Sequence, residues 1–477
     1  PPPFQAEDGI RDIHCSLVGS EMCIRDRDYI TREEARVAKA KPLGLERGRA
    51  YEIQREGYVF DYVREQLIDR YGEEEVQRGG FQVFTTIDPD LQQFAEEAID
   101  NQLGLDDDPA AAIVMIDSRT GFIRAMASSV PYGDGSQFNF AAQALRQPGS
   151  TFKTFVLTRA IEEGINPYRT IYDSKRLKFT DPQWGPIDVS TYSNSYRGPV
   201  PVSSATLSSD NSVYTQLTLD VGPTDVKGVA ERMGIPTERD LPAVPSLGLG
   251  SGEVAPLDMA VAYSPLSNGG LRVNPIAISR IKRPDGTEEQ IEPPSRERVF
   301  SDGVAYEVTR ILQDNVRAGT GGRSRIDRPT AGKTGTTDNF VDAWYVGYTP
   351  RYVTAVWVGY PNDDGSKRSM YSVHGQRVAG GTFPAAIWGE FMQPALDHLN
   401  EPADGFPLPR NPVTWSSFSS SFTRAAAAAK IAAEEKEKSE AEKEKQEEEK
   451  AKEEEKAKRE REKAKAEEPT APPPAAP

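Results

Sequence analysis

One ten-residue stretch, RQPGSTFKTF at positions 146–155, constrains the fold more than any other part of the chain. Pro148 and Gly149 are typical turn residues. The apolar residues that follow recur at helical spacing, so the stretch predicts a tight turn that leads directly into a helix. Ser150 then lies in the first helical turn, where free backbone N–H groups and the positive end of the helix dipole favour developing negative charge.

Lys153 lies three residues after Ser150, so the two side chains share one face of the predicted helix. A serine needs a base to become a nucleophile, and an unprotonated lysine one turn away can be that base. Taken alone, however, Ser-x-x-Lys is short and common, and it is more typical of a helix cap with a solvated lysine. The rest of the chain must decide between these interpretations.

Two further motifs follow in the same region. Ser209-Asp210-Asn211 lies at the start of a predicted helical segment, and Lys333-Thr334-Gly335-Thr336 lies on a predicted strand. Alone, the first is typical of a helix cap and the second of a strand end. Together with the Ser-x-x-Lys stretch, and in this order, they form the motif set of penicillin-binding proteins and class A β-lactamases.

Residues 28 to about 400 resemble a class A (bifunctional) penicillin-binding protein, from the end of its glycosyltransferase region through its complete transpeptidase domain. The resemblance implies an α+β, three-layer fold: a five-stranded, mostly antiparallel sheet between helices, with an all-helical part beside it. The segments that carry the resemblance are RQPGSTFKTF (146–155), SSDNSVYTQL (208–217), LGLGSGEVAPLDMAVAYSPLSNGG (247–270), AGKTGTTDNFVDAWYVGYTP (331–350) and FQVFTTIDPDLQ (81–92).

The resemblance also implies roles at the matching positions. Ser150 would be the acylated nucleophile and Lys153 its base, kept neutral by the charge of Lys333 and by partial desolvation. Ser209 would pass a proton to the leaving amine. Asn211 would hold both the substrate amide and Lys153.

The strand motif would bind the substrate. Lys333 would attract the terminal carboxylate of the donor peptide, and Thr334 would donate a hydrogen bond to it. Gly335 would let the substrate backbone come close to the strand. The N–H groups of Ser150 and Thr336 would form the oxyanion hole. No cofactor is implied.

The implied reaction is a D,D-transpeptidation on the extracytoplasmic face of a bacterial membrane. Ser150 would attack a D-Ala-D-Ala stem peptide, and β-lactams would acylate the same serine. The net charge of −16 argues against nucleic acid as a partner. No run of 18 apolar residues is present, so membrane association is expected only through an N-terminal anchor missing from this sequence. The charged tail is a candidate binding segment for a cell-wall or divisome partner.

Two rival functions share these motifs. A serine β-lactamase needs a second base in an E-x-x-L-N loop, and the near match at 238–242 has Pro242 in place of asparagine and follows Asn211 too closely. A non-catalytic penicillin-binding sensor or scaffold would keep the fold, but the intact motif residues argue against it.

The first 27 residues read differently from the rest. Gln5–Asp12 and Leu17–Arg27 resemble translated sequencing adapters, so we expect residues 1–27 to be a disordered artefact rather than a genuine polar segment. Both cysteines of the chain, Cys15 and Cys23, fall there, which excludes disulfides and cysteine-ligated metals from the remainder. His374 and His398 lack metal-ligand spacing, so no metal site is predicted.

The remaining chain is predicted to form six parts. They are a glycosyltransferase remnant (28–50), an α+β connector (51–104), the transpeptidase domain (105–400), a Pro/Ser-rich linker (401–423), a charged Ala/Glu/Lys helix (424–467) and a disordered Pro/Ala tail (468–477). In the remnant, Thr31 and Glu34 form a candidate capping box. The catalytic carboxylates of the glycosyltransferase would lie upstream of the remnant, so we expect this chain not to polymerise glycan.

Within the main domain we expect one mixed sheet covered by helices. The aromatic residues Trp344, Tyr345, Trp357 and Tyr360 are interpreted as core or groove wall, and Asp342 as a structural residue worth testing. The predicted strands are 111–116, 122–126, 330–336, 342–349 and 352–360, the last three in a meander; the predicted helices are 205–220, 224–233, 256–268 and 302–317, with a loop-rich stretch at 166–205.

Overall fold

The computed structural model describes residues 30–40, 56–133, 136–361, 367–422, 456, 458 and 459. Its contacts divide the chain into two units, residues 1–56 and 57–477. In the first unit, α2 (Arg32–Ala40) begins with the predicted capping box, since the N–H of Thr31 donates to Glu34 at 2.7 Å and the N–H of Glu34 donates back to the Thr31 hydroxyl at 3.2 Å.

The second unit is an α+β body. Its helices are α3 (Gly57–Tyr71), α4 (Glu73–Arg78), α5 (Pro89–Gln102), η2 (Gly149–Phe152), α6 (Lys153–Glu162), α7 (Val202–Leu207), α8 (Asn211–Val221), α9 (Pro223–Met233), η3 (Thr237–Arg239), η4 (Pro245–Leu249), α10 (Pro256–Ser267), α11 (Asp302–Ala318), η5 (Gly322–Ser324), η6 (Asp338–Phe340) and α12 (Phe383–His398). None of the helices in the described part of the chain has the length and hydropathy needed to cross a bilayer.

Five strands form the central sheet in the order β12-β13-β14-β2-β3, which confirms the predicted number of strands. Every neighbouring pair is antiparallel, whereas the sequence predicted a mixed, mostly antiparallel sheet. The strands of the body are β1 (Gln82–Thr85), β2 (Ala110–Asp117), β3 (Ile123–Ser128), β4 (Ile171–Ser174), β5 (Leu177–Asp181), β6 (Gly185–Val189), β7 (Gly198–Pro201), β8 (Leu271–Arg272), β9 (Ile278–Lys282), β10 (Glu288–Gln290), β11 (Glu297–Arg298), β12 (Ala331–Thr336), β13 (Asp342–Tyr348) and β14 (Tyr352–Gly359).

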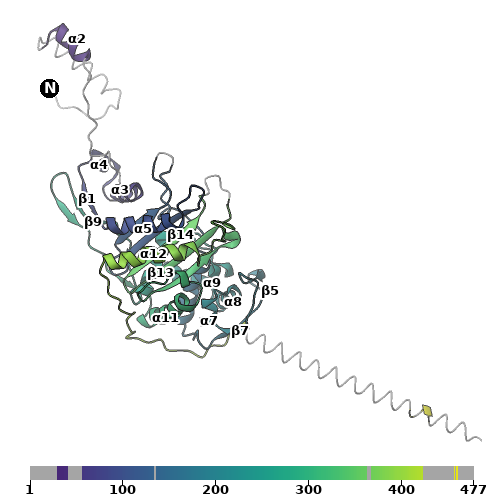
Figure 1. Ribbon diagram of the computed structural model, residues 1–477. Coiled ribbons are helices and arrows are strands. Elements are labelled where there is room, and N and C mark those ends of the chain that lie inside the picture. Colours follow the sequence, from purple (N-terminus) through teal and green to yellow (C-terminus); the bar gives the residue numbers. More distant parts are fainter. Residues whose placement is uncertain are drawn as a thin grey trace, which may run out of the picture. The chain divides into compact units, whose positions relative to one another are not determined.

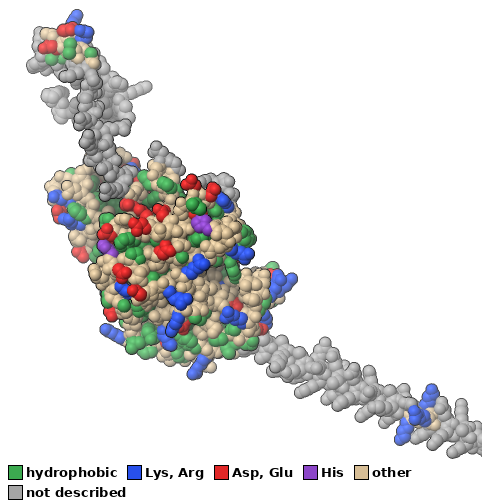
Figure 2. Space-filling view, in the orientation of Figure 1, with side chains coloured by type: hydrophobic (Ala, Val, Ile, Leu, Met, Phe, Trp, Pro, Cys, Tyr) green, Lys and Arg blue, Asp and Glu red, His purple; other side chains and the backbone are tan. Residues whose placement is uncertain are grey.

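The central sheet is buried on both faces. On one face, α5 and α12 lie side by side (Figure 1) and pack with alternate residues of the strands, such as Tyr345. On the other face, η2, α10 and α11 pack with the intervening residues, such as Trp344, and α6 packs against α11. The aromatic residues at 344, 345, 357 and 360 are therefore core residues. The solvent side of α5 carries several carboxylates, and Figure 2 shows acidic side chains gathered over this part of the surface.

The predicted connector, 51–104, makes long-range contacts with the rest of the body. Its strand β1 pairs with β9, almost 200 residues later, and β10 completes a three-stranded sheet. The hydroxyl of Thr86 donates to the carbonyls of Ile123 and Ile276, at 2.7 Å each. The separation of this segment as a domain of its own stays a prediction.

Two regions contain secondary structure that the sequence did not predict. The stretch 166–205 contains four short strands, paired as β4–β7 and β5–β6, in place of a plain loop. The helix α12 was not anticipated, because its sequence is apolar on nearly every side and carries Pro394 within it, so it lacks a periodic signal.

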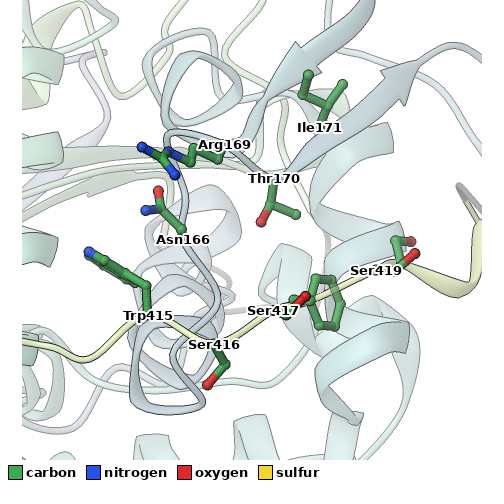
Figure 3. Close-up of a pocket in the computed structure, with 10 residues that line it drawn as sticks. Asn166, Arg169, Thr170, Ile171, Trp415, Ser416, Ser417 and Ser419 are labelled. Carbon is green, nitrogen blue, oxygen red and sulfur yellow. The ribbon is translucent and has the colours of Figure 1, made fainter.

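Residues 401–422 are fixed along the body, which differs from the expectation of a plain linker. The N–H of Ser416 donates to Gly164 at 2.8 Å, and the hydroxyl of Ser421 donates to Asp220 at 2.6 Å. Figure 3 shows residues 415–419 facing the turn at 166–171 across a hollow of about 620 Å³. The predictions for residues 1–27 and for the tail beyond 422 lie outside the described residues, apart from three isolated positions.

Candidate active site

Ser150 lies in a turn that is pinned to the sheet. The turn is the 3₁₀ segment η2, and α6 begins only at Lys153, so the serine precedes the α-helix instead of lying in its first turn. Gly149 has φ 54°, and a Cβ there would lie 2.7 Å from the carbonyl oxygen of Thr336. The indole N–H of Trp344 donates to the carbonyl of Gln147 at 2.8 Å, which fixes the approach to the turn.

Lys153, the first residue of α6, is fully buried. Its Nζ donates to the carbonyl of Ser209 at 2.6 Å and to Oδ1 of Asn211 at 2.7 Å, and it lies 3.3 Å from the Ser209 hydroxyl. Burial holds the pKa of Lys153 well below its ordinary value, and the nearby Lys333 lowers this pKa further. Burial, which the sequence interpretation placed second, is the larger cause.

Ser209 links the two lysines of the site. Its hydroxyl lies 2.9 Å from Nζ of Lys333 and 3.3 Å from Nζ of Lys153. Ser209 has φ 53°, a conformation that is uncommon outside glycine and that concentrates at functional sites. The next residue, Asp210, caps α8 by accepting from the N–H of Val213 at 3.1 Å, which fixes the backbone directly after Ser209.

Lys333 is fully buried on the edge strand β12, and burial lowers its pKa to about 7. Its Nζ donates to the carbonyl of Thr334 at 3.0 Å. The hydroxyl of Thr334 lies 2.7 Å from that of Thr320, which follows α11. Thr320 was missed from the sequence, although the glycine-rich run at 319–322 marks a turn there.

Gly335 has a different structural reason from the expected one. A Cβ at this position would lie 2.2 Å from the carbonyl oxygen of Pro148 and 3.0 Å from Cγ2 of Thr151. The glycine therefore admits the turn that carries Ser150, and its role toward a substrate backbone stays a prediction. Thr336 follows it, and its hydroxyl accepts from the N–H of Gly380 at 3.1 Å.

A cleft of about 510 Å³ gathers five of the eight predicted site residues: Ser150, Ser209, Asn211, Thr334 and Thr336. Lys153 and Lys333 lie buried against the hydroxyl of Ser209, and Gly335 faces the turn. Within the described residues the hydroxyl of Ser150 has no hydrogen-bond partner, so its lone pairs are available to a ligand in the cleft. The loop at 190–194, the 3₁₀ segment η6 and residues 379, 381 and 382 also line the cleft, and no local sequence pattern indicates them.

The family follows from comparison with known proteins. The penicillin binding protein transpeptidase domain model matches residues 111–393. The chain belongs to the penicillin-binding protein transpeptidase family. The match includes all three motifs and all five strands of the central sheet.

Similar proteins support this assignment. The chain is 35% identical over 310 residues to penicillin-binding protein 1A of Neisseria lactamica, covering 62% of this chain and 37% of that protein. It is 30% identical to penicillin-binding protein 2D of Bacillus subtilis, covering 74% of this chain and 50% of that protein. The solved structure of PonA1 from Mycobacterium tuberculosis with penicillin V has a TM-score of 0.66 and 29% identity, covering 76% of this chain and 98% of that chain. The chain thus spans about a third to a half of these curated relatives.

The β-lactamase alternative gains no support from the cleft of this transpeptidase-family chain. Glu238, the candidate second base, is exposed on η3 and does not line the cleft. Its neighbour Arg239 forms an ion pair with Asp258 at 2.7 Å, which explains the local sequence as structural.

Two further acidic positions have structural partners. Asp342 accepts from the indole N–H of Trp357 at 3.0 Å, and burial raises its pKa. Asp88, Asp90 and His398 bring ligand atoms within 4.8 Å of one another, far from the motif residues in sequence. We assign no metal to this group, because Asp88 already pairs with Arg124 at 2.8 Å and caps α5.

Proposed function

We propose that this chain is a serine D,D-transpeptidase that cross-links peptidoglycan stem peptides through an acyl-enzyme on Ser150. The observation that carries the proposal is the buried Lys153, whose lowered pKa favours the neutral amine that a general base must be. The location follows from the substrate, which would be met on the extracytoplasmic side of the membrane. An anchor outside this sequence and a tail-binding partner in the cell wall belong to the same proposal.

Acylation would begin at the exposed side of the turn. Ser150 Oγ attacks the carbonyl carbon of the penultimate D-Ala while its proton passes to Lys153. Ser209, within 3.3 Å of Lys153, then passes a proton to the leaving D-Ala nitrogen as the C–N bond breaks. The N–H groups of Ser150 and Thr336 stabilise the oxyanion, and one such donor is worth about 10²–10³ in rate.

Recognition of the donor would rest on the opposite lysine. Burial lowers the pKa of Lys333 to about 7, so without a bound carboxylate it is only partly charged near neutral pH. A carboxylate bound beside it favours the charged form and raises that pKa. Donor binding therefore loads Lys333 with a proton, and Thr334 adds a hydrogen bond to the same carboxylate. The similar PonA1 protein was solved in complex with penicillin V, which supports a site that also accepts β-lactams.

The test is covalent labelling. Mass spectrometry of the protein with penicillin should show one stable adduct, and Ser150→Ala should abolish it while circular dichroism and the melting temperature stay unchanged. Rapid hydrolysis of the penicillin would replace the proposal with the β-lactamase function. Folded protein that forms no adduct would replace it with the sensor or scaffold function.

A further inference from the structure

A second hollow meets the cleft at Ser209. It has a volume of about 480 Å³, and its walls come from the loop at 191–197, from α7 and from the residues after α11. Both hollows include Ser209 and Thr320 in their walls, whereas Ser150 and the strand motif line only the first. Ser209 therefore stands where the two hollows join.

The second hollow carries one available charge. Arg197 lines it, and within the described residues the guanidinium of Arg197 forms no ion pair or hydrogen bond. Asp210, the other charged lining residue, is buried and already accepts from Ser174 at 2.5 Å and from Ser212 at 2.7 Å. The rest of the wall is rich in hydroxyl groups, so the hollow suits a polar ligand with a negative charge.

The backbone of Arg197 is connected by hydrogen bonds to the Ser209-Asp210-Asn211 motif. Its backbone N–H donates to the hydroxyl of Ser174 at 3.2 Å, and that hydroxyl donates to the carboxylate of Asp210. Asp210 directly follows Ser209 in the chain. The loop that presents the arginine is thus tied to the residue proposed to relay protons.

Transpeptidation needs a donor peptide and an acceptor peptide. The amine of the acceptor must reach the position that the leaving D-Ala of the donor has vacated. By microscopic reversibility, the incoming amine approaches the acyl carbon from the position of the departed amine, beside Ser209. We propose that the second hollow binds the acyl acceptor, a peptide that carries a primary amine and a carboxylate, with the carboxylate on Arg197. This inference rests on the proposed transpeptidase function.

The step balances without any additional reagent. The acceptor nitrogen attacks the ester carbon, a C–N bond forms, and the bond between that carbon and Ser150 Oγ breaks. The proton that the amine loses passes through Ser209 and Lys153 to Ser150 Oγ. The free serine and one new amide are the products.

The test measures how the acyl-enzyme divides between amine and water. The protein is given a D-Ala-D-Ala-terminated peptide as donor, with an amine-bearing peptide as acceptor in its carboxylate and carboxamide forms. Both products arise from one acyl-enzyme, so any change in acylation rate cancels in their ratio. We expect Arg197→Gln to lower the aminolysis-to-hydrolysis ratio about tenfold for the carboxylate acceptor and little for the carboxamide.

The matched control is Arg169→Gln. Arg169 is an exposed arginine that lines a third hollow, the one beside residues 415–419 (Figure 3). Its replacement should therefore leave the aminolysis-to-hydrolysis ratio unchanged for both acceptors. Equal ratios for the two variants and the unaltered protein would overturn the inference while leaving the proposed function intact. An unaltered protein that is acylated by penicillin but gives no aminolysis product would overturn the transpeptidase function, and the inference with it.

Discussion

Both faces of the central sheet are buried, but they are covered by different kinds of side chain. The face under α5 and α12 has an apolar core in which Tyr345 and Trp388 are fully buried. The face under η2 and α6 buries Trp344 as completely, yet it also encloses Lys153 and Lys333. On the first face burial contributes only stability. On the second, the same exclusion of water lowers the pKa values of two amines and makes one of them a candidate base.

The largest expected effect comes from replacing Lys153, which lies on only one of the two faces of the sheet. Lys153→Met should lower the rate of acylation by penicillin about 10²–10⁴-fold, because the general base is lost. Its free energy of unfolding should change little, because relief from burying an amine offsets the loss of the hydrogen bonds to Ser209 and Asn211. Trp388→Ala on the other face should do the reverse, costing about 3–5 kcal/mol in unfolding with the folded fraction still acylated. Stopped-flow labelling and urea unfolding measure the two quantities.

The pH profile distinguishes a base from a structural lysine at the same position. The pKa of Lys153 is held well below 10.5, so the neutral amine already dominates above that lowered value. At penicillin concentrations that saturate the carboxylate site beside Lys333, acylation should therefore fall as the pH drops through the lowered pKa of Lys153. A rate that keeps rising up to pH 10.5 would contradict a neutral Lys153 near pH 7, and normal acylation by Lys153→Met would remove it as the base.

Replacing Gly335 on β12 should have an intermediate effect on acylation, and Gly332 on the same strand provides a matched control. A Cβ on Gly335 would lie 2.2 Å from the carbonyl oxygen of Pro148, and one on Gly332 would lie 2.2 Å from the hydroxyl of Tyr345, on the opposite face. Both alanine variants should lose about 1–3 kcal/mol of stability through overpacking. Only Gly335→Ala should also slow acylation, by up to about 10²-fold, because it displaces the nucleophile turn.

The measurement is the acylation rate at a temperature where both variants are folded. Equal rates for Gly335→Ala and Gly332→Ala would mean that the turn accommodates the added methyl group without moving Ser150. The two faces of the strand would then not differ in their effect on catalysis.

The sequence predicts the sheet face that carries the motifs better than the face under α5 and α12. Ser150, Ser209 and Lys333 lie in short local patterns whose order is informative, and the meander β12–β14 follows from runs of strand-forming residues. The helix α12 was missed, because a segment buried on nearly all sides has no periodicity to detect.

Long-range geometry explains the other differences. The pairing of β1 with β9 and the docking of residues 401–422 depend on partners far away in the chain, which local composition does not encode. Trp415 and Phe422 anchor a segment whose Pro/Ser content is typical of a linker. The tertiary fold likewise determines which atoms a side chain at Gly335 would meet. The motif therefore identified the glycine but not the turn that lies against it.

The smallest expected effect uses two tryptophans on opposite faces of the sheet, Trp344 on β13 and Trp388 on α12. The indole of Trp344 donates to Gln147 at 2.8 Å, and that of Trp388 donates to Thr354 at 3.2 Å. Both are fully buried, and both partners are backbone carbonyls. Replacing either with phenylalanine keeps an aromatic ring but removes the donor, at a cost of about 1–3 kcal/mol in unfolding.

Only the Trp344 carbonyl partner belongs to the segment that aims Ser150. Trp344→Phe should therefore slow acylation by about tenfold, consistent with a small misplacement of the serine, whereas Trp388→Phe should acylate at the unaltered rate. The pH midpoint of acylation should stay the same in both, because neither indole contacts Lys153. If Trp388→Phe slows acylation as much as Trp344→Phe, then strain passes through the sheet, and the apolar face takes part in positioning the nucleophile.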